Sequence, residues 1–175
     1  MGEFYNLYVV LAHPADATSA ITTVHHTIMA AGGEIDEDCT YLLETDDDDE
    51  PRPITDVETV LDDVARNPRL GLVEYFFDGA SLTVTYLNEQ PGSHVDCIRC
   101  SIPQRAFERG GEELRRAVEG LAAQLHAALR ATRTLMDWGL EARGFSWRDE
   151  VARLRAGQVV GTYPIVDVVA DETRG

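Results

Sequence analysis

The stretch LGLVEYFFDGASLTVTYL, residues 70–87, carries the clearest structural signal in the chain. Two runs, residues 70–77 and 80–87, are rich in β-branched and aromatic side chains, and only Asp78 and Gly79 separate them. A two-residue Asp-Gly loop between such runs is typical of a β-hairpin with a type I′ turn. This stretch therefore predicts two antiparallel strands joined by a tight turn.

The register of the hairpin follows from its alternating pattern. Pairing the residues that flank the turn puts six apolar side chains on one face, because side chains in a strand alternate between the two faces. These six form the cross-strand pairs Phe77 and Ala80, Tyr75 and Leu82, and Val73 and Val84. The opposite face carries Glu74, Ser81, Thr83 and Thr85, which suit solvent or a partner.

Four further strands are expected around the hairpin. Residues 94–102 extend it into a three-stranded meander, because a Gln-Pro-Gly turn precedes them. Residues 4–12 end in a continuous apolar run, which predicts burial on both faces of the sheet. Weaker patterns predict strands at residues 35–44 and 158–169, the last at an edge or a bulge because it contains a proline.

Helices are expected between these strands. Asp16 is a suitable N-cap for a helix that ends before Gly32, and Thr55 to Glu58 reads as a capping box for a second helix. Residues 111–142 predict one long helix, because apolar side chains recur along it at alternating spacings of four and three. We expect this seam to pack on the sheet, and a homodimer through the same helix is the alternative.

These elements predict a single α+β domain over residues 1–175. Its sheet is expected to be mixed but largely antiparallel, with a central β-meander and the long helix packed on it. Residues 45–53 contain five consecutive acidic side chains followed by prolines, which predicts an exposed acidic loop.

The charge of the chain is strongly negative. There are 31 acidic and 15 basic residues, all the latter Arg, for a formal net charge of −16. Such a surface repels phosphate backbones and anionic lipids, so we expect neither nucleic acid nor membrane as a partner. The acidity is open to three explanations: adaptation to a high-salt cytoplasm, genomic bias toward Arg codons, and a face that recognises a basic protein.

Location follows from what the sequence lacks. Three cysteines at positions 39, 97 and 100, without a basic leader segment, argue against a disulfide framework. No apolar run is long enough to span a bilayer. The sequence therefore predicts a cytoplasmic protein.

The segment Leu11-Ala-His13-Pro-Ala15-Asp16 is the first candidate site, because it lies where a strand ends and a helix begins. It resembles the opening of zinc-dependent N-acetylglucosaminyl deacetylases, whose first strand ends in Ala-His-Pro-Asp-Asp. The resemblance covers about 25 residues and implies that His13 and Asp16 are zinc ligands. The family's catalytic base falls at Ala15, where no carboxylate is present. A His and an Asp that merely close a strand and cap a helix are the simpler interpretation.

Two other groups of side chains are candidate sites. His94, Cys97 and Cys100 have the spacing of a zinc half-site, but residues three apart in a strand point to opposite faces. Two ordinary buried or half-buried thiols are therefore the better interpretation. His25 and His26 are adjacent on a predicted helix and cannot clamp one ion.

The functional prediction is a non-catalytic cytoplasmic binding or regulatory protein that recognises a basic protein partner and needs no cofactor. The alternative is a metal-dependent, deacetylase-like hydrolase that uses His13 and Asp16 with zinc.

Overall fold

The computed structural model describes residues 4–36, 40–43, 52–53, 56–138, 152, 155–156 and 166–170. Its elements in chain order are β1 (Phe4–Asp16), α1 (Ala17–Ala30), β2 (Glu34–Ile35), β3 (Thr40–Leu43), β4 (Arg52–Pro53), α2 (Val57–Arg66), β5 (Gly71–Phe77), β6 (Ala80–Leu87), β7 (His94–Pro103), α3 (Gln104–Leu129), β8 (Ala131–Trp138) and β9 (Val166–Val169). No helix among the described residues is both long and apolar enough to cross a membrane.

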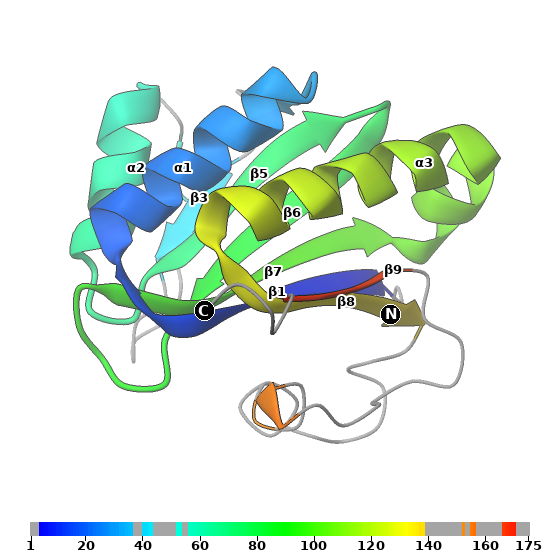
Figure 1. The fold of residues 1–175 in the computed structure, drawn as a ribbon. Coiled ribbons are helices and arrows are strands. Elements are labelled where there is room, and N and C mark those ends of the chain that lie inside the picture. Colours follow the sequence, from blue (N-terminus) through cyan, green and yellow to red (C-terminus); the bar gives the residue numbers. More distant parts are fainter. Residues whose placement is uncertain are drawn as a thin grey trace.

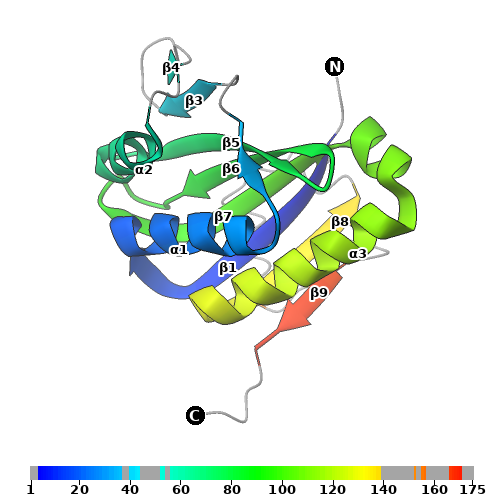
Figure 2. The ribbon, with the colours of Figure 1, turned by 90° about the horizontal axis from the view of Figure 1, so that it is seen from above.

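One antiparallel sheet forms the centre of the molecule. Its strand order is β4-β3-β5-β6-β7-β1-β8-β9, and β2 also pairs with β5. Helices α1, α2 and α3 lie on the same face of this sheet (Figure 1). Viewed from above, α3 runs across β1 and β8, while α1 and α2 cover the β5–β7 side (Figure 2). The expected α+β class, central meander and long packed helix are therefore confirmed.

The hairpin has the predicted register. Val73 lies opposite Val84, Tyr75 opposite Leu82, and Phe77 opposite Ala80. Its two loop residues, Asp78 and Gly79, have φ angles of 48° and 78°, the left-handed conformation that a type I′ turn requires at both positions. All six paired side chains are buried in the main core.

The core lies between the sheet and the helices. Leu7, Val9 and Leu11 of β1 face the helices, and α1 contributes Ile21, Val24 and Ile28. The opposite sheet face holds a second, smaller cluster of buried side chains: Tyr8, Val10, Leu87, Cys97 and Leu135. The apolar run of β1 is thus buried on both faces, as its sequence predicted.

The long helix has different ends from those predicted. It begins at Gln104, breaks at Gly111, where φ is 58°, and ends at Leu129 instead of residue 142. Arg130 then takes a left-handed conformation, and Ala131–Trp138 form strand β8, which pairs with β1. The apolar spacing that predicted the helix continues into residues that form strand β8. These residues form a strand because pairing with the free edge of β1 competes with helix propensity there.

The part of the seam inside α3 packs as expected. Leu114, Val118, Leu121 and Leu125 are buried against the sheet, whereas Ala128 is exposed. These apolar side chains are therefore occupied within the chain. The helix-mediated homodimer remains a prediction.

Smaller elements also differ from the prediction. The N-cap of α2 is Asp56 and not Thr55, the first residue of the expected capping box. The carboxylate of Asp56 accepts hydrogen bonds from the amide and the hydroxyl of Thr59 at 3.1 and 2.8 Å. The strand expected at 35–44 appears as the two short strands β2 and β3. Residues 45–51 of the expected acidic loop and residues 158–165 of the expected last strand lie outside the described residues.

Candidate functional site

The structure brings the two sequence-predicted histidine segments to one corner of the sheet. Asp16, at the end of β1, is the cross-strand partner of His94, at the start of β7. His13 is exposed and lies between Val10 and Ala15, where the register of β1 against β7 shifts. The shift marks an irregular, bulged segment, a common device for re-aiming side chains.

Asp16 has a structural role at this corner. Its Oδ2 accepts a hydrogen bond from the amide of Ser19 at 3.0 Å, so it is the N-cap of α1, as predicted. Within the described ranges, no group of three or more His, Cys, Asp and Glu side chains is placed to hold a metal ion. The capping interpretation of Asp16 is confirmed, while the metal role of His13 and Asp16 remains a prediction.

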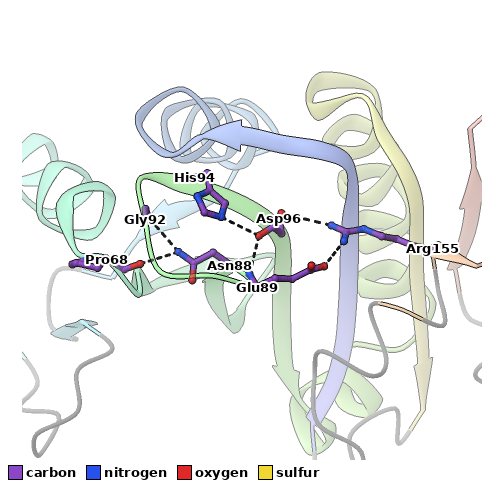
Figure 3. A network of polar contacts seen from close by, with 7 residues as sticks. All are labelled: Pro68, Asn88, Glu89, Gly92, His94, Asp96 and Arg155. Carbon is purple, nitrogen blue, oxygen red and sulfur yellow. Dashed lines mark hydrogen bonds and ion pairs between the residues drawn. The ribbon is translucent and has the colours of Figure 1, made fainter.

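A buried carboxylate organises the same corner (Figure 3). Asp96 is 3% exposed, and its Oδ2 accepts a hydrogen bond from the amide of Glu89 at 2.8 Å. His94 Nε2 lies 3.4 Å from the same oxygen, and an Arg155 nitrogen lies 3.8 Å from Oδ1. Arg155 also contacts the Glu89 carboxylate. One guanidinium thus lies close to two carboxylates, that of Glu89 in the β6–β7 connection and that of Asp96 on β7.

The β6–β7 connection itself is held by Asn88. Its side-chain amide donates to the carbonyl oxygens of Pro68 at 2.9 Å and Gly92 at 3.2 Å. These bonds tie the connection to the loop between α2 and β5, as Figure 3 shows. A buried Asn that satisfies two backbone acceptors positions the turn that carries Glu89.

The cysteines of β7 do not form a metal half-site. Cys97 lies in the small cluster on the second face, and Cys100 lies in the main core on the helix side. Burial raises the pKa of both thiols, that of Cys100 to about 12, so neither is a ready thiolate ligand. The interpretation as two separately buried thiols is confirmed.

The adjacent histidines of α1 have different surroundings. His25 is buried, and its Nδ1 shares a hydrogen bond of 2.9 Å with the Tyr75 hydroxyl. Burial lowers the pKa of His25, and the nearby His26 adds to this effect. His26 is exposed and faces a cleft instead of the core. The two rings therefore do not converge on one ligand.

That cleft separates α1 from α2 and has a volume of about 600 Å³. Its lining residues are Thr18, Thr22, His26, Asp56, Glu58, Thr59, Leu61 and Asp62. Three of them are carboxylates and none is an Arg. Hydrogen bonds from the hydroxyl and then the amide of Thr59 lower the pKa of Asp56, so this carboxylate is charged at neutral pH. The cleft is chemically suited to a cationic group flanked by hydrogen-bonding atoms.

The sequence patterns predicted neither the cleft between α1 and α2 nor the contacts around Asp96. The cleft joins one face of α1 to the first turns of α2, and nothing in the sequence indicates which helices are neighbours. Asp96 had no clear signal, because other polar side chains, among them Arg99 and Ser101, also occur in its strand. Its partner Arg155 had none, since it lies far along the chain.

No known protein family, curated protein or solved structure matches the chain. What the protein does must therefore be inferred from the geometry and charge of its own residues.

Proposed function

We propose that this is a non-catalytic cytoplasmic binding or regulatory protein, and that it recognises a basic segment of a protein partner through the cleft between α1 and α2. The observation on which this proposal mainly rests is the lining of the cleft, which combines three carboxylates with threonine hydroxyls and no Arg. Carboxylates form strong, charge-assisted hydrogen bonds with guanidinium and ammonium groups.

The individual carboxylates differ in their availability. Asp56 uses one oxygen to cap α2, and Asp62 forms an ion pair of 3.0 Å with Arg66. Glu58 is exposed in the first turn of α2. An incoming Arg or Lys side chain would meet Glu58 first, with the other two carboxylates contributing to the negative potential of the cleft.

The charge of the whole chain supports the same proposal. A net charge of −16 attracts basic partners over a distance and raises their association rate at low ionic strength. It opposes nucleic acids and anionic membranes for the same reason. The acidity also suits a cytoplasm of high salt concentration, where self-repulsion is screened.

The test is binding of a fluorescent oligo-arginine peptide to two variants with the same charge change. Glu58→Gln/Asp62→Asn removes two carboxylates from the cleft. Glu112→Gln/Glu113→Gln removes two from the exposed side of α3. The variants are closely matched, because Asp62 and Glu112 each have an Arg four residues later as an ion-pair partner.

We expect the cleft variant to bind about tenfold more weakly, a change of ~1.4 kcal/mol, and the α3 variant to change by less than about twofold. Fluorescence anisotropy at low salt measures both, with an oligo-glutamate peptide as the negative control. Equal losses in the two variants would show that only the net charge attracts the peptide, and the cleft proposal would be wrong.

A further inference from the structure

Helix α1 differs from the other helices in its composition, because none of its 14 residues is Asp, Glu, Lys or Arg. Charged residues make up 26% of the whole chain, and both α2 and α3 carry several of them. The exposed side of α1 instead presents Ser, Thr, His and Met side chains. Depletion of charged residues and enrichment in Met are characteristic of the core of a protein–protein interface. The composition of α1 therefore favours contact with a partner.

Four side chains of α1 lie in one row. Thr18, Thr22 and His26 line the cleft, and Met29 follows on the same side of the helix, because spacings of four and three place helical residues above one another. Met29 is 41% exposed although it is large and apolar. In Figure 1 and Figure 2, α2 stands beside the first part of α1, so Met29 extends the α1 wall beyond the cleft. The row is about 16 Å long, at 1.5 Å per residue.

The two walls of the cleft differ in charge. Helix α2 and its cap contribute Asp56, Glu58 and Asp62, whereas the α1 wall has no charged side chain. Leu61, which also lines the cleft, is half-buried against the core. A uniformly basic segment would place cationic groups against α1, where no carboxylate pairs with them. A segment that is basic along one side and apolar along the other matches both walls.

The backbone of the walls favours a helical partner. The lining residues all lie on α1, on α2 or at the N-cap of α2. Backbone groups inside these helices are already hydrogen-bonded, and Asp56 bonds the amide of Thr59 in the first turn of α2. An extended segment would therefore find no row of backbone partners like that of a strand edge, whereas a helix satisfies its own backbone groups.

We propose that the partner segment is an amphipathic helix, which lies in the cleft with basic side chains toward α2 and apolar side chains toward α1 and Met29. This inference rests on the proposed function, because it describes what the same cleft binds. A wall of about 16 Å corresponds to roughly three helical turns, so the partner presents its apolar anchors at spacings of three and four residues. The flexible thioether of Met29 adapts to such an anchor.

The experiment compares two fluorescent peptides of identical composition, built from Arg, Leu and Ala. In the first peptide, Arg and Leu occupy adjacent faces of a helix; in the second, the same residues are permuted so that every face carries both. The peptides are matched in helix content by circular dichroism, so a difference in binding reports the arrangement of the faces. Fluorescence anisotropy at low salt should show the first peptide binding about tenfold more tightly than the second.

A pair of variants tests the apolar end of the row. Met29→Ser should weaken binding of the first peptide about fivefold, because part of an apolar contact is lost, and should leave binding of the oligo-arginine peptide unchanged. Phe76→Ser is the matched control, since Phe76 is 48% exposed on β5 and its neighbours Tyr75 and Phe77 face the helix side of the sheet. This variant should change the binding of neither peptide.

The outcomes separate this inference from the proposed function. Equal binding of the two designed peptides, with oligo-arginine still weakened by Glu58→Gln/Asp62→Asn, would overturn the amphipathic helix and leave the acidic cleft standing. Equal effects of Met29→Ser and Phe76→Ser on the first peptide would also overturn it. If Glu58→Gln/Asp62→Asn weakened binding of the peptides no more than Glu112→Gln/Glu113→Gln, the proposed function and this inference would both be wrong.

Discussion

Removing the hydroxyl of Tyr86 should raise the free energy of unfolding, because this group has no hydrogen-bond partner within the described part of the chain. Tyr86 lies on β6 and is fully buried in the main core. Burial raises the pKa of its hydroxyl well above the ordinary value, so the group is neutral at any practical pH. The change Tyr86→Phe keeps the ring and removes one oxygen atom.

The magnitude follows from the cost of an unpaired polar group. A buried hydroxyl without a partner destabilises a protein by roughly 1–3 kcal/mol in mutational data. The small void left by one oxygen offsets part of the gain. We therefore expect Tyr86→Phe to stabilise the protein by about 1 kcal/mol, an unusual sign for a change in a fully buried position.

Tyr75→Phe is the matched control. Tyr75 lies on the neighbouring strand and faces the same core, but its hydroxyl is hydrogen-bonded to His25 Nδ1 at 2.9 Å. Its removal leaves a buried ring nitrogen without that partner and should cost about 1–3 kcal/mol. The two identical chemical changes should therefore have opposite signs.

Urea unfolding at pH 8 measures both variants. His25 is neutral at this pH, because burial lowers its pKa from the ordinary 6.5. The midpoint should rise for Tyr86→Phe and fall for Tyr75→Phe, with unchanged m-values. A lower midpoint for Tyr86→Phe would show that its hydroxyl has a partner, such as an enclosed water, and would refute the reasoning.

Three further predictions test the charge, the core and the metal hypothesis. With a net charge of −16, the melting temperature should rise between low and molar sodium chloride, and neutralising several acidic residues should flatten the rise; a salt-independent melting temperature would contradict the high-salt explanation. Val84→Ala should cost about 2 kcal/mol in denaturant unfolding, whereas Thr83→Ser, on the half-buried opposite face, should cost less than about 1 kcal/mol; equal costs would contradict the assigned faces. Protein purified without chelator should contain no stoichiometric metal by elemental analysis, and a zinc ion bound one-to-one and lost in His13→Ala would favour the hydrolase alternative.

The opposite face of the hairpin shows that the sequence pattern does not determine how deeply a polar side chain is buried. Thr83 and Glu74 form hydrogen bonds of 2.9 Å on this partly exposed face. Burial raises the pKa of Glu74, and nearby Asp36 adds to the rise despite the hydrogen bond from Thr83. Thr85, expected to suit solvent or a partner on the same face, is only 7% exposed. Polarity assigns a side chain to a face, but the degree of burial depends on what else packs there.

The sequence by itself determined the features that depend on near neighbours. The hairpin register follows from an Asp-Gly turn and a period of two, and its partners are adjacent along the chain. The cap of α1 at Asp16 and the opposite faces of Cys97 and Cys100 follow from equally local geometry. Each of these was predictable, because turn chemistry and side-chain alternation act over a few residues.

Only the tertiary structure decided the features that depend on distant segments. Ala131–Trp138 form a strand because β1 offers an edge there, although their apolar spacing continued the pattern of a helix. The pairing of Asp16 with His94, the cleft between α1 and α2, and the contacts of Arg155 all join residues far apart in the sequence. A repeating pattern specifies the face and period of an element, whereas its neighbours are selected by the packing and backbone hydrogen bonding of the whole chain.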